Sequence, residues 1–312
     1  MNADASEEYQ LKWESRSSVR TRPRKPIDFS LSGDFFPMDR HVLFLLPEVC
    51  ALEDKKKDIL LLSFLKYLND IIQLETHFIY GACHSIMHRD MPVAYADVIK
   101  RNASTVIIDE YYHVYIAYDL LSQLRGKYSH LPHLDSHFSD ATQAMETIKE
   151  TLPKKYHDIF EIVAVCIFET TLIRELVTYF DSATIHPSIK YYINDHMNDE
   201  SRHFGFFYEL LCYTWANMPE GYRQNIGSKL GEFVTLYLNV KADIEHNTCI
   251  LSWALDDPEK AKGLVEKLYH GFNISPDLPI VKNVLRVLTQ SGVLSHEAVQ
   301  QSFVSYALIA QG

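Results

Sequence analysis

The sequence predicts an all-α protein, a bundle of four long helices followed by further helices, and three observations lead to this fold class. Four long segments carry apolar residues at helical spacing, as bundle helices do. Glycine and proline number only 11 and 12 among 312 residues, too few for an all-β chain with many tight turns. Hydrophobic residues make up 47% of the chain, which is enough for a substantial core.

The first elements are an arm and two helices. Residues 1–40 contain the breakers "PRKP" and "LSGDFFP" and are expected to be irregular. Helices are then predicted over about 55–86 and about 92–125, because apolar residues recur there every three or four positions. A polar, histidine-rich connection, "GKYSHLPHLDSHFSD", follows the second helix.

The third and fourth long helices are predicted over about 154–181 and about 188–217. Pro187 suits the start of the fourth helix. Four shorter helices are expected after it, with breaks near "DDP", "NISPDLP" and "SGVLS". We therefore expect a single domain, 1–312, in which residues 55–217 form the bundle and residues 218–312 add further helices.

Charge and composition exclude several classes of protein. The formal net charge of −11 disfavours a nucleic-acid binder. The basic stretch "RSSVRTRPRK" (16–25) is interpreted as a solvated arm or a strap across the fold, with docking of an acidic partner as the alternative. No apolar run approaches the roughly 20 residues that span a bilayer, and the acidic stretch "MNADASEEYQ" is not expected to act as a signal peptide. Five cysteines without a CxxC pair fit buried free thiols, so we expect a soluble cytoplasmic protein.

Two short strings carry the chemistry. Asp-Glu occurs only at 109–110 and 199–200, and both pairs are followed by His at the same spacing, in "DEYYH" and "DESRH". Residues three apart share a helix face, so Glu110 with His113, and Glu200 with His203, can each reach one metal ion. Chance would give on the order of 0.1 such strings in a chain of this length.

The other two long helices each offer one glutamate within an apolar stretch, Glu75 and Glu169. A buried lone glutamate is costly without a partner, and a structural partner is the alternative for each. The order Glu, DExxH, Glu, DExxH is nevertheless the full pattern of a di-metal carboxylate bundle. Four carboxylates balance two divalent cations, and oxygen and imidazole ligands favour non-haem iron or manganese over an iron–sulfur cluster.

Three further residues are assigned to this site. Asp109 and Asp199 are expected to accept the free ring N–H of the histidine on the opposite motif, pairing with His203 and His113 respectively; plain solvation is the alternative. His196 lies one turn before Glu200, within about 60° of it and of His203 around the helix. We predict that His196 is a third histidine ligand, and a core histidine is the alternative.

The four glutamates and three histidines, in this order, resemble the p-aminobenzoate N-oxygenase family of ferritin-like proteins. "FETTLIREL" and "HMNDESRHFGFF" resemble its third and fourth metal helices, and "WESRSSVRTRPR" resembles its N-terminal region. The resemblance extends to about residue 215, and no motif was matched in the C-terminal third. The ligand set that it implies is Glu75, Glu110, His113, Glu169, His196, Glu200 and His203.

The resemblance implies a homodimer whose di-iron cluster activates O2 and oxidises a primary amine to hydroxylamine, nitroso and nitro products, in natural-product biosynthesis. One O2 supplies four oxidising equivalents and amine hydroxylation uses two, so two electrons must come from outside. The chain has no flavin or nicotinamide fingerprint, and a reductase or another external donor is expected.

The substrate cannot be named from the sequence. Val106, Tyr192 and Phe207 lie one turn from the ligands, as does Ile173, and core packing is the alternative for each. Arg286 could bind a substrate carboxylate or be solvated. An aromatic or aliphatic amine, free or tethered to a carrier protein, fits equally. A di-metal oxygenase acting at carbon, by hydroxylation, desaturation or C–C cleavage, is the alternative activity. Metal storage is disfavoured by the third histidine.

Overall fold

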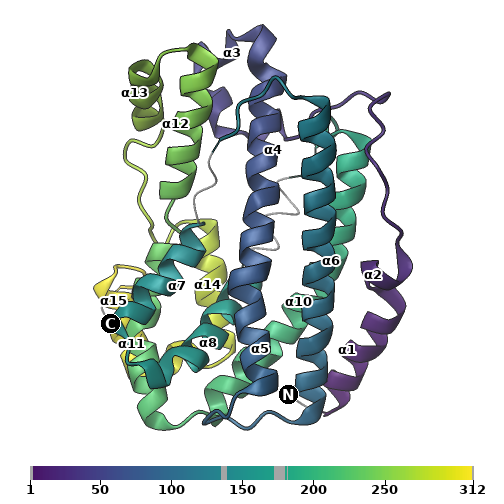
Figure 1. Cartoon of the computed structure of the whole chain (residues 1–312). Coiled ribbons are helices and arrows are strands. Elements are labelled where there is room, and N and C mark those ends of the chain that lie inside the picture. The colour runs from purple at the N-terminus through teal and green to yellow at the C-terminus, as the bar shows by residue number, and fades with distance from the viewer. Residues whose placement is uncertain (1–2, 135–138, 172–179, 181, 311–312) are drawn as a thin grey trace.

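The computed structural model describes residues 3–134, 139–171, 180 and 182–310. Its regular elements are helices, and the strand-like pairing within these residues is a β-bridge between Asp34 and Ile185. The predicted fold class is confirmed: the chain is all-α, with a ferritin-like bundle and additional C-terminal helices (Figure 1).

The first two bundle helices follow the sequence closely. Helix α4 (Lys56–Gln73) continues through a π-helical segment, η4 (Leu74–Ile79), into α5 (Tyr80–His88). Helix α6 (Asp97–Lys127) forms the second, and Figure 1 shows it beside α4. Buried positions in α6 recur every three or four residues, so one face points into the bundle.

The third and fourth bundle helices are α8 (His157–Glu169) and α10 (Pro187–Asn217). The predicted continuation of the third helix lies largely outside the described residues, and so does Ile173. Pro187 occupies the first turn of α10, where its missing N–H costs no hydrogen bond, and the His186 ring caps the Ser188 N–H.

The expectation of an irregular arm over residues 1–40 holds for residues 22–37 but was wrong for residues 3–21. Residues 3–21 hold helices α1 (Ala3–Arg16) and α2 (Ser18–Thr21), and Figure 1 shows both along α6. Tyr9 and Trp13, four residues apart, are each only 7% exposed. These two aromatic side chains lie on one face of α1 and hold it to the bundle. Two apolar residues are too few to produce a helical periodicity in the sequence. Arg22 and Arg24 of the basic stretch pair with Asp195 of α10 and Asp119 of α6, so this stretch also lies across the bundle, and we call residues 3–25 the strap.

A second helix was also missed. Helix α7 (Asp140–Thr151) follows the polar connection, with Ser139 capping its N-terminus by accepting from the Thr142 N–H at 3.3 Å. Its buried face consists of small and apolar residues. The serine cap and the apolar spacing in "SDATQAMETI" are signals that could have predicted it.

The C-terminal part contains five α-helices rather than the four expected. The breaks near "DDP", "NISPDLP" and "SGVLS" are confirmed, and the additional break, at 238–240, carries no glycine or proline. The helices are α11 (Glu220–Tyr237), α12 (Lys241–Leu255), α13 (Pro258–Leu268), α14 (Pro279–Gln290) and α15 (Glu297–Ser305). The remaining short helices are η1 (Met38–Arg40), η2 (Val42–Leu45), α3 (Pro47–Cys50), η3 (Glu53–Lys55), η5 (Lys154–Tyr156) and η6 (Val293–Ser295).

One hydrophobic cluster joins the bundle to the C-terminal helices. Phe160 of α8 packs edge-on against Phe233 of α11, with ring centroids 5.7 Å apart. Helix α11 also lies so close to α15 that a Cβ at Gly231 would come within 2.6 Å of the Ser302 carbonyl oxygen. In the part of the chain that the structure describes, every helix is too short or too polar to cross a bilayer.

Candidate metal centre

The four bundle segments bring all seven predicted ligands together in the protein interior. Glu75 lies in the π-helical segment, and such segments occur frequently at functional sites because the extra residue re-aims side chains. Helix α6 supplies Glu110 and His113, and Glu169 is the last residue of α8. Helix α10 supplies the other three, His196, Glu200 and His203. None of the seven residues is more than 6% exposed.

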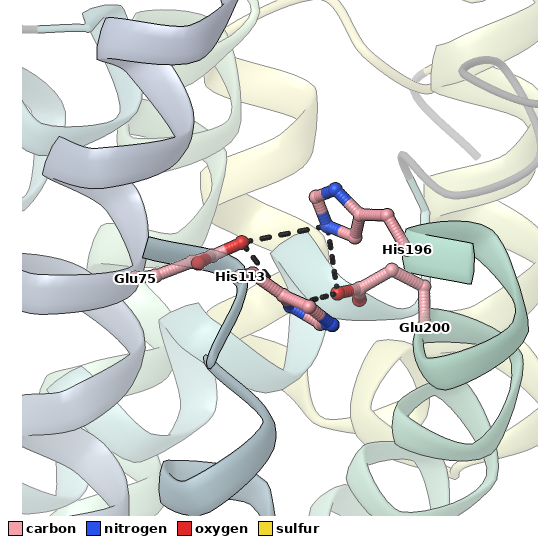
Figure 2. Close-up of side chains that lie close together, drawn as sticks. All are labelled: Glu75, His113, His196 and Glu200. Atoms are coloured by element: carbon pink, nitrogen blue, oxygen red, sulfur yellow. Dashed lines mark hydrogen bonds and ion pairs between the residues drawn. The ribbon is translucent and has the colours of Figure 1, made fainter. Parts of the chain in front are cut away.

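The first group of ligand atoms comes from Glu75, His113, His196 and Glu200, all within 4.8 Å of one another. His196 Nε2 lies 3.1 Å from Glu200 Oε1 and 3.4 Å from Glu75 Oε1. His113 Nδ1 lies 3.5 Å from Glu75 Oε1 and 3.6 Å from Glu200 Oε1. Figure 2 shows the four side chains converging from opposite sides on one small volume.

The second group comes from Glu110, Glu169, Glu200 and His203, again with ligand atoms within 4.8 Å of one another. His203 Nδ1 lies 3.0 Å from Glu110 Oε1 and 3.5 Å from Glu200 Oε2. Glu200 therefore belongs to both groups and presents a different oxygen to the histidines of each. This is the arrangement of a carboxylate that could bridge two cations.

The donor atoms of this cluster fit metal ions on two grounds. Two carboxylate oxygens of the cluster, Glu75 Oε2 and Glu169 Oε2, are buried without a hydrogen-bond partner among the described residues. Buried polar atoms are normally satisfied, so these exceptions need an explanation. Oxygen and imidazole donors are also the set that suits non-haem iron or manganese.

The electrostatics of the metal-free cluster are those of crowded acids. Burial and then the neighbouring carboxylates raise the pKa values of Glu75 and Glu169 well above the ordinary range. Burial alone would lower the pKa of His113 and of His203, but adjacent carboxylates raise both well above the ordinary value. In the metal-free protein, protons on these four groups neutralise part of the carboxylate charge. In the metal-bound protein, divalent cations would neutralise that charge instead.

Both predicted aspartate–histidine hydrogen bonds are present. His113 Nε2 lies 3.1 Å from Asp199 Oδ2, and His203 Nε2 lies 3.3 Å from Asp109 Oδ2. Each bond crosses between α6 and α10 and leaves the other ring nitrogen, Nδ1, facing the cluster. Because the aspartate accepts the ring proton, it selects the tautomer that exposes a lone pair at Nδ1.

The sequence analysis missed Arg202, which joins the two aspartates. Its Nη2 atom donates to Asp109 Oδ2 at 3.1 Å and also to Asp199 Oδ1. Both carboxylates are fully buried, and such a pair requires a positive partner. Arg202 lies three residues after Asp199 on one helix face, so its spacing could have indicated this role.

Comparison with known proteins decides the family. The family described as P-aminobenzoate N-oxygenase AurF matches residues 6–266. The chain belongs to this family. No curated protein matches the chain. The P-aminobenzoate N-oxygenase family consists of di-iron oxidoreductases, and the resemblance noted in the sequence is thereby confirmed. The match begins within α1 and ends within α13, so it extends beyond residue 215, where the sequence motifs ended.

The predicted pocket residues fall into three environments within this N-oxygenase fold. Val106 and Phe207 are fully buried in the main hydrophobic cluster. Tyr192 lines a small cavity of about 30 Å³ that also touches His113 and His196, beneath the strap. Arg286 is exposed on α14, so its position gives no support to carboxylate binding beside the metal ligands.

A larger cavity that the sequence did not predict is lined partly by α4 and α12, and none of the seven predicted ligands is among its described lining residues. It has a volume of about 540 Å³, and its wall includes Tyr67, Phe180 and Tyr269. The Tyr67 hydroxyl is buried without a hydrogen-bond partner in the described part of the chain. Burial, and then the negative charges of Glu75 and Glu200, raise the pKa of Tyr67, so its phenol is within electrostatic range of these two carboxylates.

Proposed function

We propose that this protein is an O2-activating di-iron N-oxygenase that converts a primary amine to hydroxylamine, nitroso and nitro products. The observation that carries the proposal is the set of seven buried ligands, which form two groups sharing Glu200. One cation would be held by Glu75, His113, His196 and Glu200, and the other by Glu110, Glu169, Glu200 and His203. Iron is the proposed metal, and manganese fits the same donors.

The iron pair, when bound, supplies the reduction of O2. The first oxidation then balances as RNH2 + O2 + two electrons + two protons giving RNHOH + H2O, with the electrons from an external donor. The protein's contribution is to hold the ligands in fixed directions and to exclude water. Phe78 and Val106, each about one helical turn from a predicted ligand, belong to the main hydrophobic cluster, and burial disfavours an ammonium ion. The substrate nitrogen would therefore be presented as the neutral amine, with its lone pair available.

We assign the substrate to the cavity beside Tyr67. Its aromatic walls suit an apolar or aromatic amine. Lys66, which also lines it, donates to Asp70 and lies 3.0 Å from Asp243, so it is already neutralised. We therefore do not assign Lys66 to a substrate carboxylate. A free amine and an amine on a carrier protein both remain within this proposal.

A panel of aromatic and aliphatic amines tests the proposed activity. Iron-loaded protein, a chemical reductant and O2 should yield hydroxylamine, nitroso or nitro products by mass spectrometry. Products oxidised at carbon would instead support the alternative oxygenase, and no oxidation of any amine would count against the proposal.

Two matched variants test the assigned cavity. The hydroxyls of Tyr67 and Tyr192 are both buried without a hydrogen-bond partner among the described residues. Tyr67 lines the large cavity, and Tyr192 lines the small cavity beneath the strap. Tyr67→Phe should lower kcat/KM for the amine about 10-fold or more, whereas Tyr192→Phe should have a smaller effect. The reverse order would place the substrate beneath the strap.

The remaining features of the proposal concern organisation and partners. We propose one domain, supported by the hydrophobic cluster shared between the bundle and the C-terminal helices. A separate reductase, assembly as a homodimer, a cytoplasmic location and a role in natural-product biosynthesis belong to the same proposal. The five free cysteines are compatible with a reducing compartment.

A further inference from the structure

The N-terminal strap reaches the two aspartates that bind the metal-facing histidines. The indole N–H of Trp13, in α1, donates to Asp109 Oδ1 at 3.0 Å. The backbone N–H of Ser18, the first residue of α2, donates to Asp199 Oδ1 and Oδ2 at 3.1 and 3.2 Å. Both aspartates are fully buried, so these two donors satisfy oxygens that have no access to bulk water.

With these bonds, every oxygen of both carboxylates is engaged. Asp109 accepts from Trp13 on one oxygen and from Arg202 and His203 on the other. Asp199 accepts from the Ser18 N–H on both oxygens, and each oxygen has a second donor, Arg202 or His113. Donors on both sides of a carboxylate fix its plane, and the plane fixes the direction in which the histidine points its other nitrogen.

We propose that residues 3–21 are an integral part of the metal centre, in which the Trp13 indole and the Ser18 backbone N–H are positioning groups. They act through Asp109 and Asp199 on the histidines, and docking of the strap and binding of metal stabilise one another. The proposal rests on the metal centre proposed above and adds a coupled segment outside the bundle. Coupling of this kind is reciprocal. If docking of the strap raises the affinity for metal by some factor, bound metal raises the equilibrium constant for strap docking by the same factor.

Charge explains the direction of the coupling. Asp109 and Asp199 carry two negative charges and Arg202 carries one positive charge, so the network has a surplus of negative charge. A bound cation takes the place of the proton at Nδ1, and relative to a neutral imidazole it polarises the ring and makes the remaining N–H a stronger donor to the aspartate. Metal binding therefore tightens the carboxylates that Trp13 and Ser18 hold.

The strap is held weakly enough for this coupling to matter. Over residues 7–16 of α1, only Tyr9 and Trp13 are buried. A helix with so few apolar anchors opens at a low free-energy cost, and a modest gain at one hydrogen bond changes its docked population.

Limited proteolysis of the full chain measures docking. Arg16 and Arg20 are exposed and are followed by Ser17 and Thr21, so trypsin can cut after either once the strap opens. The metal-free protein and the same protein with Mn(II) are compared, and Mn(II) binding is measured in parallel. We expect cleavage of the strap to be about 10-fold slower with Mn(II) bound.

Two pairs of variants separate the hydrogen bonds from packing. Trp13→Phe removes the indole donor, and its control, Tyr9→Phe, keeps a buried ring against Phe206. Ser18→Pro removes the backbone donor at the first residue of a helix, where proline is tolerated, and Ser18→Ala keeps it. Trp13→Phe and Ser18→Pro should each weaken Mn(II) binding about 10–100-fold and abolish the metal-dependent protection. Both controls should behave as the wild type.

The possible outcomes distinguish this inference from the proposed function. Wild-type protein that binds two Mn(II) ions without any change in strap cleavage would overturn the coupling. Equal losses in the controls and in their partner variants would show that the strap acts by packing, which also overturns it. Wild-type protein that binds no Mn(II) would instead defeat the proposed metal centre itself.

Discussion

His196 Nε2 lies 3.1 Å from Glu200 Oε1, one helical turn along α10. This contact places a third imidazole beside the carboxylate shared by the two ligand groups. In the proposed metal centre, a neutral donor at that position would fill a coordination site without changing the charge of the cluster, and it would distinguish this site from a bundle with six ligands.

Replacing His196 tests that distinction. In His196→Ala the helix should persist because alanine is the better helix former, and the other six residues should still bind two metals, less tightly. Amine oxidation should fall sharply, measured as product formed per bound iron. His77→Ala is the control, since His77 is an exposed histidine two residues after Glu75. Unchanged turnover in His196→Ala would make His196 a core residue.

The aspartate–histidine bonds give a second prediction. Asp109→Ala and Asp199→Ala should each weaken iron binding or activity about 10–100-fold, because the histidine loses the group that orients it. Iron titration and turnover of each variant provide the measurement. Asn198→Ala is the control on α10, because Asn198 is exposed and its side-chain amide donates back to the Asn194 carbonyl of the same helix. Wild-type behaviour in both test variants would show that these acids do not orient the ligands.

The raised pKa values predict how the stability of the metal-free protein depends on pH. Glu75, Glu169, His113 and His203 all have pKa values raised above their ordinary values of 4.5 and 6.5 in the folded state. Their protons stabilise the fold at low pH, and this contribution is lost as pH rises through the folded-state values.

Thermal unfolding provides the check. The Tm of metal-free protein should fall between about pH 6 and about pH 9, and added Mn(II) should raise it more at the higher pH, because metal binding displaces protons. A Tm that is flat with pH, with the same Mn(II) effect throughout, would contradict the assigned protonation.

The glycine contacts predict opposite effects at two helical positions. In Gly231→Ala the new Cβ would lie 2.6 Å from the Ser302 carbonyl oxygen, so α11 and α15 must separate, at a cost of about 1–3 kcal/mol. Gly263, in α13, has open space around it, and Gly263→Ala should stabilise the protein by about 0.5–1 kcal/mol. Chemical denaturation of both variants measures this, and destabilisation of both to the same extent would refute the packing argument.

The bundle could be predicted because chemistry and periodicity agree there. Glu110 and Glu200 stand out as acids in long apolar helices, and the repeated spacing to His113 and His203 identifies partners without any structure. The predicted bounds of the first, second and fourth helices lie within about five residues of those observed, whereas α8 ends at Glu169, before the predicted end near 181.

The strap and the large cavity could not be predicted in the same way. Trp13 contacts Asp109 across 96 residues, and the local sequence of α1 is mostly polar. Tyr67 is one of 19 tyrosines, and only the fold brings it near Glu75 and Glu200. Long-range contacts of this kind leave no periodic signal in a single sequence.

Metal content tests the central claim most directly. Protein expressed with ample iron and purified without chelators should contain about two iron or manganese ions per chain by elemental analysis, because the seven ligands form two groups. Glu200→Ala, which removes the residue common to both groups, should lose both ions rather than one. A wild-type content near zero, or a single zinc ion per chain, would contradict the account.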